Sequence, residues 1–348
     1  DGGHVLFAGE GYKDDAGKTQ ISSSELPAAA ISTRSLTGAI KMYFFKTYLK
    51  AGNVNLLRRV EYLPEGGFAY RTTEIAEHVA AAKSILLLVH GIIGDTEGMA
   101  AGVKECGVAD KFDLVLTYDY ESLNTLIGDT ARSLQAQLAQ VGLDANDGKS
   151  LTMLVHSMGG LVSRWFIERE GGKHAVDHLV MCGTPNNGSP FGKIDGARKI
   201  AKVLTGLAMN YIPTVVPVAS VLMLALNRSA KVTPALEQMN PDSDFIKTLN
   251  TSADPGIRYT ILAGNVDEYQ EPSDAFFAKM IAKVGQNDVF EMLFAQKPND
   301  IAVGVESILG VGTGRATVPV RTNIACHHLN YLVSANGQKA LTSVAWDG

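Results

Sequence analysis

The feature that most constrains the fold of this chain is a set of short, continuous apolar runs. SILLLVH at 84–90 and SLTMLVH at 150–156 contain no acidic or basic residue before their closing histidine. Such runs are typical of strands covered on both faces, as the strands of a parallel sheet are. Further strands are predicted at 113–120, 176–185, 257–264 and 317–325.

Helical patterns separate these runs. One helix is predicted from apolar residues that recur at three- and four-residue spacing before Gly142, namely Leu123, Leu126, Ile127, Leu134, Leu138 and Val141. Further helices are predicted at 96–106, 159–170 and 274–295. Strands that alternate with helices through short turns predict an α/β fold with a doubly wound, mostly parallel sheet.

One segment departs from this alternation. Residues 203–226 hold no charged side chain, over a length that would suit a membrane-spanning helix. Asn210, Pro213 and Pro217 interrupt the segment, and a span here would separate the strands on either side. We therefore expect an apolar helical cap, inserted over residues 191–250, that packs over a site on the sheet.

The rest of the domain organisation follows from where the alternation begins. The α/β core is expected at 81–190 and 251–348, on both sides of the insertion. Residues 1–80 are expected to form an N-terminal extension with a β-hairpin packed on the sheet. The strands of that hairpin are predicted at 55–63 and 66–74, because Pro-Glu-Gly-Gly separates the two runs.

The beginning of the chain gives weaker signals. Residues 13–24 are polar and are predicted to form a loop, and residues 34–50 fit either a helix or a strand pair. The chain begins with Asp1, and its first residues do not form a signal peptide. We expect a processed protein or a part of a longer chain with a fused or regulatory partner.

Composition excludes several classes of protein. Hydrophobic residues make up 46% of the chain and charged residues 19%, which supports a large core. The net charge is −5 without a lysine or arginine block, so nucleic acid is not an expected partner. Three cysteines, Cys106, Cys182 and Cys326, form no disulfide framework, which favours a cytoplasmic location. The three cysteines form no closely spaced pair of metal ligands, and neither a metal nor a cofactor is expected.

The turn after the second apolar run carries the strongest chemical signal. Val155-His156-Ser157-Met158-Gly159-Gly160 joins a predicted strand to a predicted helix. The Gly-x-Ser-x-Gly turn of serine hydrolases exposes its serine in this position, where close backbones require small neighbours. Here Val155 replaces the first glycine, and Gly159 and Gly160 are left to provide the room. The alternative is that Ser157 merely caps the helix.

The first apolar run ends in a loop that fits the same chemistry. Acyl transfer needs two N–H donors for the oxyanion, one after the nucleophile and one from a neighbouring strand end. The N–H groups of Met158 and Ile92 are the candidates. Gly91 and Gly94 let the loop bend so that the Ile92 N–H points inward. His90 is expected to hold this loop through hydrogen bonds.

A base and an acid are expected later in the chain, in the order serine, acid, histidine. His328 is the candidate base, because LNYL after it is expected to start a helix that fixes the loop; the adjacent His327 is the fallback. Asp300, in the polar turn of KPNDIAVGVES, is the candidate acid. The other carboxylates considered are Asp267, which also follows a strand end, Asp274 and Asp288.

Together these segments resemble the lipase and esterase branch of the α/β-hydrolase superfamily. The similarity runs in order over about residues 84–333, through HGIIG (90–94), HSMGG (156–160), GTPNNGS (183–189), PALEQMNPDSDFIKTLN (234–250), NDIAVGVES (299–307) and HHLNYL (327–332). Two positions depart from the pattern. Val155 stands where the family has Gly, and Ile301 follows Asn-Asp where family members often have Gly.

The resemblance implies hydrolysis of a carboxylic ester through an acyl-enzyme. Ser157 attacks, His328 takes its proton, Asp300 fixes the histidine, and the N–H groups of Met158 and Ile92 hold the oxyanion. An apolar cap over 203–226 favours an acyl or lipid ester substrate and contact with a membrane surface.

Two alternatives stay open. A peptidase or an acyltransferase can use the same catalytic residues, because the cap and not the triad decides the substrate. A hydrolase-like module without catalysis, which binds a partner or a membrane through 203–226, is the second alternative.

Overall fold

A single eight-stranded sheet forms the framework in the computed structural model. Its strands are β3 (Leu56–Tyr62), β4 (Phe68–Arg71), β5 (Ser84–Val89), β6 (Leu114–Asp119), β7 (Ser150–His156), β8 (His178–Cys182), β9 (Arg258–Gly264) and β10 (Val320–Ile324). The structure describes residues 11–13, 19–21, 55–92, 96–145, 147–199, 233–268, 294 and 297–346.

The order of strands across the sheet is β10-β9-β8-β7-β5-β6-β3-β4. Neighbours from β6 to β10 pair in parallel, whereas β3 is antiparallel to both β4 and β6. The predicted doubly wound, mostly parallel α/β sheet is therefore confirmed. Its parallel strands end at a common edge, and a polar or glycine-rich turn follows several of them there.

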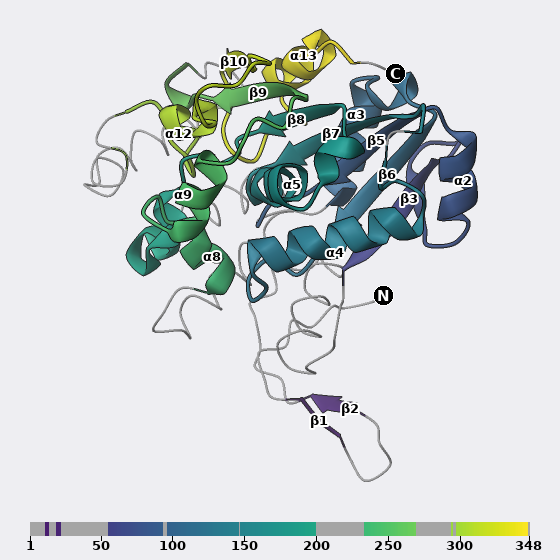
Figure 1. The fold of residues 1–348 in the computed structure, drawn as a ribbon, viewed down its shortest axis with the longest axis horizontal. Helices are drawn as coiled ribbons and strands as arrows, with labels where there is room; N and C mark the ends of the chain where they lie inside the picture. The colour runs from purple at the N-terminus through teal and green to yellow at the C-terminus, as the bar shows by residue number, and fades with distance from the viewer. Residues whose placement is uncertain are drawn as a thin grey trace.

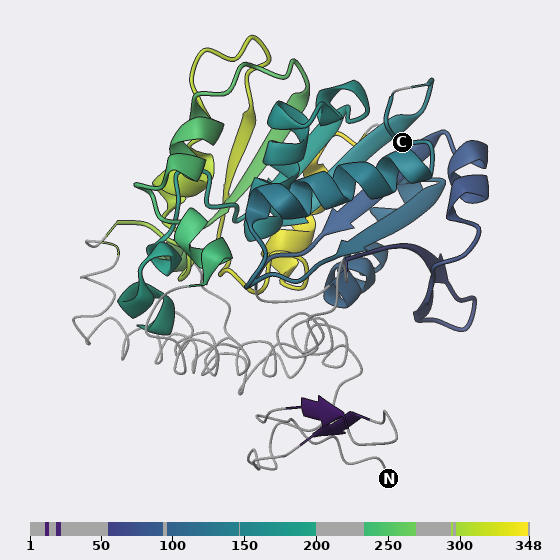
Figure 2. The same ribbon diagram turned by 60° about the horizontal axis from the view of Figure 1, so that its bottom comes forward.

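Helices cover both faces of the sheet. The α-helices are α2 (Ile75–Ala81), α3 (Thr96–Glu105), α4 (Ile127–Gln140), α5 (Met158–Arg169), α8 (Pro234–Gln238), α9 (Asp244–Asn250), α12 (Val305–Leu309) and α13 (Ala335–Ser343). Short 3-10 turns are η2 (Ala109–Lys111), η3 (Gly172–His174), η4 (Pro190–Gly192) and η5 (Val266–Glu268). Helices α4 and α5 lie in front of the sheet in both views (Figures 1 and 2).

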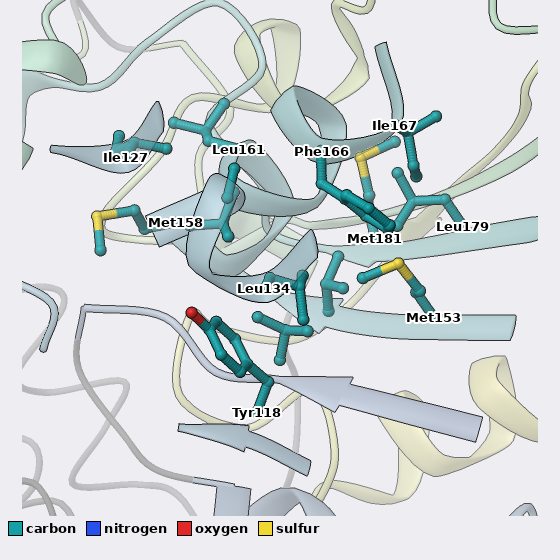
Figure 3. Close-up of a cluster of buried hydrophobic side chains, with 14 of the residues drawn as sticks. Tyr118, Ile127, Leu134, Met153, Met158, Leu161, Phe166, Ile167, Leu179 and Met181 are labelled. Carbon is teal, nitrogen blue, oxygen red and sulfur yellow. The ribbon is translucent and has the colours of Figure 1, made fainter. Parts of the chain in front are cut away.

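Alternate residues of the central strand enter two different cores, as a strand with both faces covered requires. Ile85 and Leu87 of β5 belong to the cluster with α4 and α5, and Leu86 and Leu88 belong to the cluster with α3 and α13. Part of the first cluster is drawn in Figure 3, where Leu134 of α4 and Leu161 of α5 meet the sheet residues.

The apolar face of the predicted helix begins at Leu123, but helix α4 begins four residues later, at Ile127. The buried carboxylate of Glu121 accepts the backbone N–H groups of Leu123 and Asn124, which holds this stretch in a turn. The helix therefore starts at Ile127, and Leu123 packs in the core from the turn.

The predicted hairpin joins the sheet edge to edge instead of packing on it as a separate layer. β3 pairs with β4, and it also pairs with β6, which makes the hairpin the last two strands of the sheet. Nearer the start of the chain, β1 (Gly11–Lys13) pairs with β2 (Thr19–Ile21), and β2 falls within residues 13–24, which were predicted to form a loop.

Some expectations fall outside the described residues. These are the helix or strand pair at 34–50, the apolar segment 203–226, most of the cap, and nearly all of the helix at 274–295. Among the helices that the structure describes, none combines the length and apolar composition needed to cross a membrane.

A buried ionic cluster joins α5 to two distant segments. The side chain of Glu168 in α5 is fully buried and pairs with Arg164 and Arg315 at 2.9 Å each. It also accepts the hydroxyl of Tyr259 at 2.9 Å. Because two buried guanidinium groups share this carboxylate, removal of its charge leaves them without their main counter-charge.

We predict that Glu168→Gln lowers the free energy of unfolding by about 3–5 kcal/mol, because it breaks a buried ionic cluster. Urea unfolding measures the loss. The matched control is Glu306→Gln, which removes a pair with Lys297 in which both side chains are more than half exposed. The control is expected to cost at most about 1 kcal/mol. Equal losses in the two variants would contradict the prediction.

Candidate active site

Ser157 lies on a strained turn between β7 and α5. Its backbone has φ 53° and ψ −128°, a positive φ that residues other than glycine rarely adopt. Its N–H donates to the carbonyl oxygen of Cys182 at the end of β8. The side chain makes no capping hydrogen bond to α5, which argues against the interpretation of Ser157 as a simple helix cap.

Three glycines allow the backbones around Ser157 to approach closely. A Cβ atom at Gly159 would lie 2.3 Å from the carbonyl oxygen of His90, and one at Gly160 would lie 1.9 Å from Oγ1 of Thr184. A Cβ atom at Gly91 would lie 2.5 Å from Cβ of Ser157. Any side chain at these positions would force the segments apart, so the room is provided on the far side of the turn, as predicted.

Val155, which replaces the first glycine of the turn, is accommodated without such crowding. Its side chain is fully buried and belongs to the apolar cluster under α5. At this position the strand contributes to the core. Gly159 and Gly160 are the residues that allow the helix and the strand to approach closely.

His328 connects Ser157 with Asp300. Its Nε2 lies 2.9 Å from Ser157 Oγ, and its Nδ1 lies 2.7 Å from Asp300 Oδ2. A carboxylate only accepts, so Nδ1 carries the proton and Nε2 accepts the hydrogen of the serine hydroxyl. The three residues are at most 4% exposed. The structure thus brings together the predicted serine, histidine and acid, from segments far apart in the chain.

The Asp300 carboxylate is held by a tight turn. Its Oδ1 accepts the N–H groups of Ala302 and Val303 at 3.1 and 2.8 Å. Its Oδ2 accepts the hydroxyl of Tyr331 at 2.9 Å in addition to His328. In the chain, Ile301 lies between Asp300 and Ala302. Its backbone φ is 88°, an unfavourable value for a β-branched residue. This is the position after Asn-Asp at which glycine was expected, and glycine adopts a positive φ without this cost.

The other candidate acids do not reach the histidine in the described residues. Asp267 lies in η5, where its N–H donates to Asn265 Oδ1, and its carboxylate is not hydrogen bonded to His328. Asp274 and Asp288 lie outside the described residues. The prediction of a helix at LNYL was wrong: residues 329–332 form turns, and α13 begins at Ala335 after its cap Ser334.

Two further histidines surround His328 and differ from it in their contacts. His156 Nε2 donates to the carbonyl oxygen of His328 at 2.7 Å, and His327 Nδ1 accepts the N–H of Leu329. Burial, with a smaller effect from His328, lowers the pKa of each to about 3. Both therefore stay neutral, and His327, the fallback base, bonds to the backbone rather than to Ser157.

The predicted oxyanion donors flank the serine. Met158 is the first residue of α5, so its N–H has no partner within the helix. Ile92 is 2% exposed and follows Gly91, which contacts Ser157 directly. Gly94 lies outside the described residues.

His90 holds the loop before Ile92, as predicted. Its Nε2 accepts the N–H of Tyr120, so its Nδ1 carries the proton and donates to the carbonyl oxygen of Gly91 at 2.6 Å. The ring also stacks on Tyr120, with 4.4 Å between the ring centroids.

Sequence reasoning missed the residues that hold the start of α3. Thr96, where α3 begins, donates to the buried carboxylate of Asp119 at the end of β6. Arg58 of the hairpin pairs with the same carboxylate, and the Tyr70 hydroxyl bonds to Thr96 at 3.2 Å. The hairpin therefore helps to hold the start of α3 against the end of β6. In the sequence, the acidic Asp119 at the end of a predicted strand was the signal that could have indicated this contact.

The GTPNNGS segment supports the turn that carries Asp300. Ser189 Oγ donates to the carbonyl oxygen of Ala302 at 2.8 Å, and Asn186 Nδ2 donates to that of Ile308 at 2.6 Å. In the part of the chain that the structure describes, the His, Cys, Asp and Glu side chains form no group of three or more that could hold a metal ion.

Solved structures with a similar fold include lipases and esterases. The lipase BlEst2 of Bacillus licheniformis in its mature form is 18% identical, with a TM-score of 0.47 over 75% of this chain and 90% of that chain. EstA from Clostridium botulinum is 14% identical, with a TM-score of 0.48 over 75% and 85%. A thermophilic esterase from Thermogutta terrifontis is 14% identical, with a TM-score of 0.43 over 83% and 90%. None of the curated proteins searched matches this sequence.

The topology of the sheet and the order of the site residues along the chain follow the pattern expected from the sequence. A serine turn joins a parallel strand to a helix, and an acid and a histidine follow near the ends of later strands, as in α/β-hydrolases. Residues 58–345 match the model of the family described as a domain of unknown function, DUF7379, so the chain belongs to that family.

Proposed function

We propose that this protein is a serine hydrolase that cleaves carboxylic esters through an acyl-enzyme. The observation that carries the proposal is the His328 side chain, whose two ring nitrogens bond to Ser157 and Asp300 at 2.9 and 2.7 Å. A nucleophile, a base and a group that orients the base, all in hydrogen-bond reach, are the signature of nucleophilic catalysis.

The first half of the reaction follows from the proton positions. Ser157 Oγ attacks the ester carbonyl carbon while His328 Nε2 takes the hydroxyl proton. The N–H groups of Met158 and Ile92 stabilise the negative charge that forms on the carbonyl oxygen. His328 then returns the proton to the leaving alcohol, which leaves the acyl group on Ser157.

The second half reverses these roles with water. His328 takes a proton from the water that attacks the acyl carbon, and it then gives that proton back to Ser157. Asp300 stays ionised throughout, because its task is to fix the histidine tautomer and stabilise the imidazolium. Its carboxylate accepts four hydrogen bonds, from the N–H groups of Ala302 and Val303, from His328 and from Tyr331.

An acyl or lipid ester is the proposed substrate, with membrane-surface contact through 203–226. The same catalytic residues would serve a peptidase or an acyltransferase. A series of p-nitrophenyl esters of increasing chain length and a panel of peptides separate these substrates. The non-catalytic alternative is disfavoured by the intact Ser157–His328–Asp300 chain, since a module without catalysis does not need the strained serine turn.

We predict that Ser157→Ala abolishes labelling by a fluorophosphonate probe and lowers ester hydrolysis by about 10⁴-fold or more. Gel fluorescence and the release of p-nitrophenol measure the two effects. The control is Ser163→Ala, which removes a buried hydroxyl on the same helix whose partner is the carbonyl oxygen of Gly159. It is expected to keep both activities, and labelling of Ser157→Ala would refute the assignment.

A second prediction concerns the close contact at Gly91. Gly91→Ala places a methyl group against Ser157, so we expect kcat to fall by about 10²-fold, as happens when a reacting group is moved by about 1 Å. The control is Gly304→Ala, whose added Cβ has its nearest neighbour at 3.9 Å. Unchanged hydrolysis by Gly91→Ala would show that the segment does not approach the serine.

The pKa values near 3 of His156 and His327 make the free energy of unfolding depend on pH. Unfolded histidine titrates at about 6.5, so between pH 6.5 and 3 the unfolded chain binds more protons than the folded one. Stability is therefore fully present above pH 6.5 and falls as the pH drops, by up to about 1.4 kcal/mol per pH unit for each histidine.

We predict that His327→Gln makes the fall in the free energy of unfolding between pH 6.5 and 5 shallower. Urea unfolding at several pH values measures the slope. The same exchange at His174, which is exposed, is expected to leave the slope unchanged. An equal slope in wild type and His327→Gln would mean that His327 titrates normally in the folded protein.

A further inference from the structure

The ring of Tyr331 occupies a slot that two glycines keep open. A Cβ atom at Gly183, after β8, would lie 2.8 Å from Cε2 of Tyr331. A Cβ atom at Gly264, at the end of β9, would lie 2.7 Å from its hydroxyl oxygen. The ring is 1% exposed. Two strand ends are thus shaped to admit one phenol ring beside the Asp300 turn.

The hydroxyl of Tyr331 is bonded on both sides. It accepts the N–H of Gly264 at 2.6 Å and donates to Asp300 Oδ2 at 2.9 Å. Burial, followed by the charge of Asp300, raises the pKa of Tyr331 well above 10, so the phenol keeps its proton. With the N–H of Gly264 using its acceptor side, the hydroxyl can direct its hydrogen only toward the carboxylate.

The same carboxylate oxygen serves both Tyr331 and His328. Asp300 Oδ1 is meanwhile fixed by the N–H groups of Ala302 and Val303. The phenol therefore decides how much of the Oδ2 charge faces the His328 ring, and it prevents the carboxylate from turning away. Neither role was assigned to Tyr331 from the sequence, in which LNYL was only expected to start a helix.

We propose that Tyr331 is a positioning residue for the reaction, which orients Asp300 and shares its charge so that His328 is held as the base for Ser157. The inference rests on the proposed function. The other titratable groups around His328 and Asp300 do not compete for this role. His156 and His327 stay neutral, and burial raises the pKa of Cys326 well above its ordinary value, so its thiol stays protonated.

The test is Tyr331→Phe, which removes the hydroxyl and keeps the ring, measured per fluorophosphonate-reactive site. We expect kcat for p-nitrophenyl esters to fall about tenfold with KM unchanged, because one charge-assisted hydrogen bond to the orienting acid is lost. The acid limb of the kcat/KM profile should move to higher pH, because the carboxylate then directs more charge to the imidazolium.

The matched control is Tyr259→Phe, which also removes a buried hydroxyl that donates to a carboxylate, that of Glu168. It should lower thermal stability without moving kcat or the pH profile. A second variant, Gly264→Ala, keeps the Tyr331 hydroxyl and pushes it from its place. It should reproduce the fall in kcat and the pH shift, and it tests the inference if Tyr331→Phe folds poorly.

The measurements distinguish failure of the Tyr331 inference from failure of the proposed function. Wild-type kcat and an unmoved acid limb in both variants, with only lower stability, would make Tyr331 structural and overturn the inference alone. A wild type that takes no label and hydrolyses no ester would overturn the proposed function, and the inference with it.

Discussion

The close approach of three backbone segments at Ser157 is the constraint on which the site depends. The ends of β5 and β7 and the start of α5 meet there, with Gly91 against the serine and Gly159 against the carbonyl oxygens of Val89 and His90. The serine has a positive φ there, and its hydroxyl lies 2.9 Å from Nε2 of His328. The hydrogen bonds of His328 are useful only because that hydroxyl is fixed.

Much of this arrangement could be predicted from the chain. The apolar runs gave the parallel strands, because a strand with both faces covered leaves no place for charge. The order of serine, acid and histidine then selected Ser157, Asp300 and His328, which lie together since parallel strands end at one edge of the sheet. Val155 and Ile301 depart from the expected pattern: Val155 packs in the core, and Ile301 has a positive φ.

Other features depend on tertiary contacts that periodicity does not record. The start of α4 is set by the Glu121 carboxylate, which binds backbone N–H groups that the apolar spacing had assigned to a helix. The support of Asp119 by Arg58 joins residues that are 61 positions apart. The hydrogen bond from Tyr331 to Asp300 requires that Gly183 and Gly264 have no side chain, because the phenol ring occupies that space. The sequence does not show which side chain lies against these glycines.

The central claim is that Ser157 carries the acyl group during turnover. Rapid acid quenching of the protein with a slowly hydrolysed p-nitrophenyl ester, followed by digestion and mass spectrometry, locates that group. We expect the acyl mass on the peptide that contains Ser157, at a yield that follows the initial burst of p-nitrophenol. An acyl group on another residue, or a burst without any modification of Ser157, would contradict the account.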